Sequence, residues 1–432
     1  MKLGRLLVGV LIGALVLVSC GSEDTATTDR AEDSGSATTE SQDEVVEIVW
    51  QAHSTPVYTP EFWDTILERF HEENPDIRVE RVMAPDTNAD QFVRTLIAAD
   101  SMPDVVMSIN TEDFKEALLP LEIDEDVKRV RNWEAVLIDG KLYSYGAALV
   151  PESLVFYNKD LFEEAGIADT PSSIEELEAA MNTFKDMGVT PLIVAGEWVP
   201  GRFFSSFFNA LNVFDDHRDF YTKWLEGELA IAEEWLPDAQ LLKKWVDAGY
   251  IDSGGLGDGY QQGEEKFLTG GGAMYPMGVW LTGVLASNPP DFEPGVFAMP
   301  AMDGDEVLSA RFGRPGISVS ANTDQREAAI RFAKFLAFDD WAHPIITERD
   351  GLISDLQPPA MYDMTDVQQT IFDLTQSHTI VPTWTGWGDS RPPAGFAEEI
   401  NTVIQDLIIG NATPETAMAA LDQYPETVGD DG

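Results

Sequence analysis

The sequence has 432 residues, of which 44% are hydrophobic and 10% aromatic, so it can bury more than one hydrophobic core. Its 76 acidic residues outnumber 27 lysines and arginines, which gives a formal net charge of −49 at pH 7. Because nucleic acids and anionic membranes bind clustered cations, this charge excludes a protein whose main partner is a polyanion. The acids are spread along the chain, and we interpret them as a solvated surface, with adaptation to a saline habitat as a further hypothesis.

The N-terminal segment is typical of an exported lipoprotein. Two cations precede an apolar run from Leu6 to Val18, which is too short for a membrane-spanning helix and indicates a signal peptide over residues 1–19. The end of this run and the residues after it, Leu17 to Gly21, resemble the lipobox of bacterial lipoproteins. This segment contains Cys20, the only cysteine of the chain. We therefore expect Cys20 to be lipidated, with an ordinary signal peptide and an incidental cysteine as the alternative.

Residues 20–44 are expected to form the lipidated cysteine and a disordered tether. After Cys20 the segment is rich in small, polar and acidic residues and has no aromatic or large aliphatic side chain. Such a composition cannot offset the entropy lost on ordering. The mature protein is therefore expected in the cell envelope, on the outer face of the cytoplasmic membrane or in the periplasm, held by its lipid anchor.

The folded part is expected to begin with an open α/β sheet. In chain order the expected elements are a strand over 45–50, a helix from Thr59 to Asn74, a strand over 77–82, a helix over 91–99 and a strand over 104–107. This β-α-β-α-β series favours parallel strands joined by right-handed crossovers. Because ligands collect at the carboxyl ends of such strands, the loops at 53–58 and 108–113 are candidate binding loops.

A second α/β unit is expected after Pro151. Its expected elements are a strand over 154–157, a helix that begins at the capping residues Ser172 and Ser173 and ends near 188, a buried strand over 191–195, and late helices near 324–338, 396–409 and from 413. Many aromatic residues between 201 and 250 lie in helical surroundings, and we assign most of them to the core.

Three groups of motifs carry a resemblance to a known family. They are DGKLY at 139–143 with LVFYNKDLFEEAG at 154–166 and PSSIEEL at 171–177, then FLTGGGAMYPMGVW at 267–280, and GISVSAN at 316–322 ahead of FAKFL at 332–336. In this order they resemble the family 1 extracellular solute-binding proteins, the maltose- and multiple-sugar-binding components of ATP-binding-cassette importers.

The resemblance implies an α/β fold of the periplasmic-binding-protein type II, with two discontinuous lobes joined by a hinge. It places an N-terminal lobe at 45–150 and 316–355 and a C-terminal lobe at 151–315 and 356–432. Chain crossings between the lobes are then expected near 147–154, 310–316 and 351–359. The implied function is capture of a carbohydrate in the cleft between the lobes and delivery to the permease subunits, by a monomer without a cofactor.

The cleft should combine flat aromatic rings with a few polar groups, because a sugar has apolar C–H faces and a rim of hydroxyls. By resemblance, Trp280 and the pair Glu197 and Trp198 match cleft segments of the relatives, and Trp384 or Trp387 adds a stacking ring. Core packing is the alternative for the rings. The strand-end loops add polar candidates, for which ordinary turn chemistry is the alternative: His53, Ser54, Asn110 and Glu112. Arg314, at a chain crossing, contacts either the ligand or a surface carboxylate.

The competing classes are a secreted carbohydrate-active enzyme and a surface adhesin. The many carboxylates make any pair of them uninformative as a catalytic signal. The five histidines lack metal-ligand spacing, and the sequence has neither an H-E-x-x-H nor a G-x-S-x-G motif. The glycine-rich segment 254–259 is expected to be a loop. We therefore expect no catalysis and no bound metal, and a polyol or glycerol-phosphate-like solute is the alternative ligand.

Overall fold

The computed structural model describes residues 45–55, 57–84, 89–208, 217–302, 304, 306–383, 385–393 and 395–425. The expected signal peptide, the lipidated Cys20, the tether and Trp384 lie outside the described residues. Within the described ranges, none of the helices has both the length and the apolar character that a bilayer span requires.

The first sheet contains β2 (Ile77–Met83), β1 (Val46–Ala52), β3 (Val105–Met107) and β9 (Ile317–Val319), in that order. β1 pairs in parallel with β2 and β3, and α1 (Pro60–Glu73) and α2 (Ala89–Ala98) form the crossovers. The predicted β-α-β-α-β series is confirmed. The late strand β9, which runs antiparallel to β3, closes the sheet on one side.

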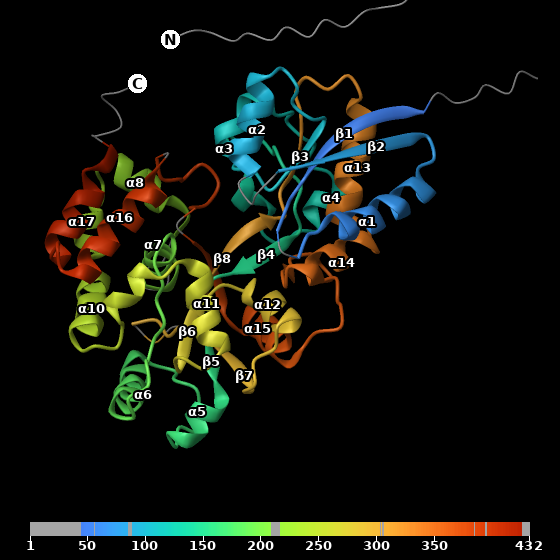
Figure 1. The fold of residues 1–432 in the computed structure, drawn as a ribbon. Coiled ribbons are helices and arrows are strands. Elements are labelled where there is room, and N and C mark those ends of the chain that lie inside the picture. The colour runs from blue at the N-terminus through green and yellow to red at the C-terminus, as the bar shows by residue number, and fades with distance from the viewer. Residues whose placement is uncertain are drawn as a thin grey trace, which may run out of the picture. The chain divides into compact units, whose positions relative to one another are not determined.

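One hydrophobic core covers this sheet. The indole of Trp50 on β1 meets the ring of Trp63 on α1 at 5.0 Å and that of Phe332 on α13 (Arg326–Phe338) at 5.1 Å, both edge to face. The core draws on residues 48–147 and again on 317–356. Two distant stretches of the chain therefore fold together, with α13 packed beside the first sheet (Figure 1).

A second sheet joins strands from the middle of the chain. β5 (Leu154–Asn158) pairs antiparallel with β6 (Met274–Met277) and with β7 (Pro294–Ala298). The predicted strand over 191–195 is wrong. That segment is buried, but Leu192 forms only isolated bridges, one to Ile251 and one to Met274, the first residue of β6, so the pairing does not extend into a ladder.

The third sheet has the order β10 (Ile353–Ser354), β4 (Ala148–Pro151), β8 (Val307–Arg314) and β11 (Thr379–Pro382). β4 pairs antiparallel with both β10 and β8. The three segments expected to cross between lobes thus include neighbouring strands of one sheet. In Figure 1, β4 and β8 lie between the first sheet and the group of β5, β6 and β7.

A second hydrophobic core is built from residues 135–312 and 352–421. The aromatic residues assigned to the core between 201 and 250 are buried wherever the structure describes their side chains, whereas Phe208 and Phe214 are not among these. The remaining helices are α3 (Thr111–Phe114), α4 (Glu125–Lys128), α5 (Lys159–Glu164), α6 (Ile174–Asp186), α7 (Val199–Phe203), α8 (Phe220–Leu225), α9 (Ile231–Glu234), α10 (Leu236–Asp247), α11 (Tyr260–Leu268), α12 (Leu281–Ser287), α14 (Ala342–Arg349), α15 (Asp366–Ser377), α16 (Phe396–Ile409) and α17 (Pro414–Asp422).

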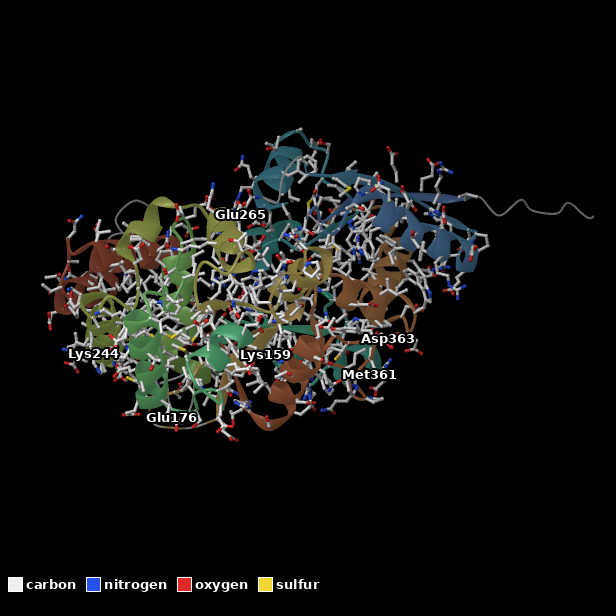
Figure 2. The ribbon with its side chains drawn as sticks, turned by 60° about the horizontal axis from the view of Figure 1, so that its bottom comes forward. Lys159, Glu176, Lys244, Glu265, Met361 and Asp363 are labelled. Carbon is white, nitrogen blue, oxygen red and sulfur yellow. The ribbon has the colours of Figure 1, made fainter. Side chains whose placement is uncertain are left out.

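The acidic side chains lie mostly on the surface. Figure 2 shows Glu176 and Glu265 on the outside of the molecule, and both are exposed. Over the part of the chain that the structure describes, the buried acidic residues are Glu152, Asp238 and Asp355. A buried carboxylate is therefore the exception in this acidic protein, and each one needs a specific partner.

Candidate functional site

Three aromatic side chains from separate segments form one cluster, which we call the aromatic platform: Trp198, Tyr260 and Trp280. Trp198 precedes α7, Tyr260 opens α11, and Trp280 directly precedes α12. The ring centroids of Trp198 and Tyr260 are 5.0 Å apart, and those of Trp198 and Trp280 are 6.0 Å apart. Trp198 is 37% exposed, which is unusual for so large an apolar ring and leaves it accessible to a ligand.

The glycine of the G-x-W motif explains how Trp280 is seated. A Cβ atom at Gly278 would lie 2.0 Å from the indole of Trp280, so any other residue there would displace the ring. The guanidinium of Arg311 lies 5.9 Å from the centroid of the same indole. Trp280 is partly buried against the second core, which restricts its orientation as a stacking surface.

Glu197 lies at the edge of the platform. Its φ of 58° is left-handed, and its carbonyl oxygen accepts hydrogen bonds from Asn401 Nδ2 at 2.6 Å and Gln405 Nε2 at 3.1 Å, both on α16. Its carboxylate lies beside Gly259, where a Cβ atom would meet Glu197 Oε1 at 2.6 Å. The side chain is exposed, so the carboxylate can accept hydrogen bonds from a ligand.

Tyr260 and Glu264 are not among the site residues predicted from the sequence. The hydroxyl of Tyr260 donates a hydrogen bond to Glu264 Oε2 at 2.9 Å, and burial raises the pKa of Glu264. This pair is one turn apart on α11 and follows the glycine-rich loop. The sequence does contain a signal for this pair, because a tyrosine and a glutamate four residues apart lie on the same face of a helix.

A buried charged cluster lies next to the platform. Glu152 is fully buried between β4 and β5, and its carboxylate accepts hydrogen bonds from Arg202 Nη1 at 3.0 and 3.1 Å and from Ser206 Oγ at 2.7 Å. Arg311 Nε forms a third, short contact with it. Burial alone would raise the pKa of Glu152, but the guanidiniums of Arg202 and Arg311 outweigh it, and the pKa is lowered. Arg311 therefore joins the charged cluster to Trp280.

A cavity of about 630 Å³ adjoins this region, since Arg311 also lines it. Its other lining residues come mainly from α2, the segment after β3, β8 and the segment around the start of α16, and include Asp90, Asn110, Glu112, Arg314 and Arg391. Three of the predicted site residues, Asn110, Glu112 and Arg314, thus share one cavity. The volume is sufficient for a small or medium-sized ligand.

The other predicted residues lie at different places. His53 and Ser54 are partly buried, and neither lines this cavity. The carbonyl of His53 accepts a hydrogen bond from Trp63 Nε1 at 2.8 Å. Trp387 packs against Phe312, with ring centroids 5.2 Å apart, and under the guanidinium of Arg218 at 4.5 Å. Among the described residues, Trp387 makes no ring contact with the aromatic platform.

His53 should make stability depend on pH. Burial and then Arg314 lower its pKa from 6.5 to about 4. Between pH 7 and pH 5 the unfolded chain therefore binds a proton that the folded chain does not, so stability is lost as the pH falls. In urea unfolding, the free energy of unfolding should fall between pH 7 and pH 5 by about 1–2 kcal/mol less in His53→Gln than in the wild type. Equal losses in both proteins would contradict this assignment.

Comparison with known proteins places these features in context. Residues 56–343 match the family described as bacterial extracellular solute-binding protein. The multiple sugar-binding protein of Streptococcus mutans is 22% identical over 323 residues, which cover 70% of this chain and 76% of the relative. The diacetylchitobiose binding protein DasA of Streptomyces coelicolor is 22% identical over 348 residues, with 76% and 78% covered.

Solved structures share the fold. A chitin oligosaccharide binding protein superposes with a TM-score of 0.74 at 20% identity, over 89% of this chain and 99% of the other. A sugar transporter protein from Bacillus licheniformis in complex with stachyose has a TM-score of 0.66 at 21% identity, over 88% and 99%. The predicted two-lobed α/β fold of type II is therefore confirmed.

Proposed function

Because the chain belongs to the bacterial extracellular solute-binding proteins, we propose that it captures a carbohydrate between its two lobes and delivers it to the permease subunits of an ATP-binding-cassette importer. Relatives named for multiple sugars and for diacetylchitobiose support a sugar as the ligand. In this proposal the protein binds its ligand and changes no covalent bond.

The observation that carries the proposal is the aromatic platform with carboxylates at its edge. The rings of Trp198, Tyr260 and Trp280 offer the flat apolar surface on which the C–H face of a pyranose stacks. Glu197 and Glu264 supply acceptors for sugar hydroxyls beside the rings. Stacking provides the affinity, and the carboxylates fix the orientation of the ring.

We propose that the cavity extends this site. Asn110, Glu112 and Arg314 then contact the part of the ligand that lies beyond the platform, while His53, Ser54, Trp384 and Trp387 belong to its margins. The two cores support lobes at 45–150 with 316–355 and at 151–315 with 356–432, because each core draws on two distant stretches of the chain. A few backbone positions in the third sheet would absorb the closing motion.

We propose that Cys20 anchors the monomer to the outer face of the cytoplasmic membrane. The apolar run before a single cysteine supports this proposal. Metabolic labelling with radioactive palmitate should mark the wild-type protein and leave Cys20→Ala unlabelled. Equal labelling of both proteins would contradict lipidation at this cysteine.

A thermal-shift screen tests the ligand class. Chito-, malto- and raffinose-type oligosaccharides are each added at millimolar concentration, and a ligand present at 100 times its Kd should stabilise the protein by about 2.7 kcal/mol, which raises Tm by a few degrees. Chromatography of the same mixtures should show the sugars unchanged. A new product would indicate an enzyme, and no stabilisation by any carbohydrate would contradict the proposal.

A further inference from the structure

Four arginines, Arg94, Arg311, Arg314 and Arg391, line the 630 Å³ cavity in a chain whose acidic residues outnumber its cations almost threefold. Arg314 is only partly exposed, and its guanidinium makes no hydrogen bond or ion pair with the residues that the structure describes. Arg391 donates hydrogen bonds to the carbonyl oxygens of Gly388 at 2.5 Å and Ala135 at 3.4 Å, and among the described residues it has no ion-pair partner. Two guanidiniums at this cavity therefore lack a contacting counter-ion.

Four carboxylates line the same cavity, and two of them are ion-paired. Asp113 pairs with Arg94 at 2.6 Å, and Glu112 pairs with Lys115 at 2.8 Å. Asp90 Oδ1 accepts a hydrogen bond from the backbone N–H of Asn110 at 2.8 Å. Asp113 and Glu112 are therefore ion-paired, whereas Asp90 acts on Arg314 electrostatically without an ion pair, and Glu398 is a fourth lining acid.

Charges of both signs lie next to Arg314. Glu152 is a single carboxylate shared by the two guanidiniums of Arg202 and Arg311. Asp350 acts on Arg314 electrostatically without forming an ion pair in the described part of the chain, and burial raises the pKa of Asp350 to about 6. Arg314 therefore has the carboxylates of Asp350 and Asp90 nearby, but among the described residues neither of them contacts its guanidinium.

We infer that the ligand is an acidic carbohydrate whose carboxylate binds Arg314, so that a sugar with a uronic acid residue is preferred to a neutral one. This inference rests on the proposed function. A carboxylate matches the planar fork of a guanidinium and forms two parallel, charge-assisted hydrogen bonds with it. The aromatic platform and the cavity meet at Arg311, so one oligosaccharide can stack on the platform and place its carboxylate in the cavity.

Matched ligands test the inference. Calorimetry compares uronic-acid oligosaccharides with the same compounds after reduction of the carboxyl group to a hydroxymethyl group. We expect the wild type to bind at least one acidic compound about tenfold more tightly than its neutral counterpart. Arg314→Gln should abolish this preference, and Arg314→Lys should keep part of it. Arg326→Gln removes an exposed arginine of α13 and should leave the preference unchanged.

The other outcomes separate this inference from the proposed function. If neutral sugars bind as well as acidic ones and Arg314→Gln leaves the ratio unchanged, the inference is overturned while carbohydrate binding stands. If Arg314→Gln weakens acidic and neutral ligands equally, Arg314 acts on lobe closure through its interactions with Asp350 and Asp90, which also overturns the inference. If neither set binds, the proposed function fails as well. Circular dichroism and the unfolding midpoint of each variant show that it is folded.

Discussion

Replacing Glu152 with glutamine is expected to lower the free energy of unfolding by about 3–5 kcal/mol. The carboxylate is fully buried and is the shared partner of Arg202 and Arg311. Its removal takes this counter-ion away from two partly buried guanidiniums, and the loss of charge compensation is more destabilising than the loss of a hydrogen bond. Urea unfolding at pH 7 measures the change.

The matched control is Glu265→Gln, which removes an exposed carboxylate on the surface shown in Figure 2. This control should change the stability by less than about 0.5 kcal/mol. A loss below about 1 kcal/mol for Glu152→Gln would show that the two arginines do not depend on this carboxylate, and the charged cluster would then have no structural role.

Replacing Trp280 with alanine is expected to weaken carbohydrate binding by about thirtyfold, or about 2 kcal/mol. The substitution removes the ring that lies against Gly278 and contacts Trp198. The stacking surface then loses the indole whose orientation is held by its neighbours. Isothermal titration calorimetry with the tightest carbohydrate from the screen gives the change in Kd.

Two variants make this measurement specific. Trp280→Phe keeps an aromatic face and should recover part of the affinity. Trp341→Ala removes a partly buried indole of the first core, which lies under Arg69 and outside the platform, and should leave Kd unchanged. An affinity of Trp280→Ala within twofold of the wild type would exclude Trp280 from the site.

The first sheet could be predicted from the sequence because its signals are local. Thr59 and Pro60 mark the start of α1, and Thr59 Oγ1 accepts the hydrogen bond from Phe62 N that a helix cap requires. Trp198 follows a buried apolar segment, and Trp280 ends a glycine motif. The family resemblance of both segments predicted a cleft residue, which stays a prediction, and the structure brings the two rings to 6.0 Å.

The charged cluster could not be predicted because its members are far apart in the sequence and meet only in the folded chain. Glu152 is one of 76 acidic residues, and the residues next to it in the sequence do not distinguish it from the exposed acids. Its partners Arg202, Ser206 and Arg311 lie 50 to 159 residues away. The prediction of a strand over 191–195 was wrong for a related reason. An apolar run indicates burial, but it does not show whether a neighbouring strand pairs with it along its length.

The most direct test of carbohydrate capture is a crystal structure of the protein with the tightest ligand from the screen. We expect one sugar ring to stack on the platform of Trp198, Tyr260 and Trp280. Its hydroxyls should bind Glu197 or Glu264, and the rest of the ligand should lie in the adjoining cavity. A ligand bound elsewhere on the molecule, with these three rings free of contact, would contradict this prediction.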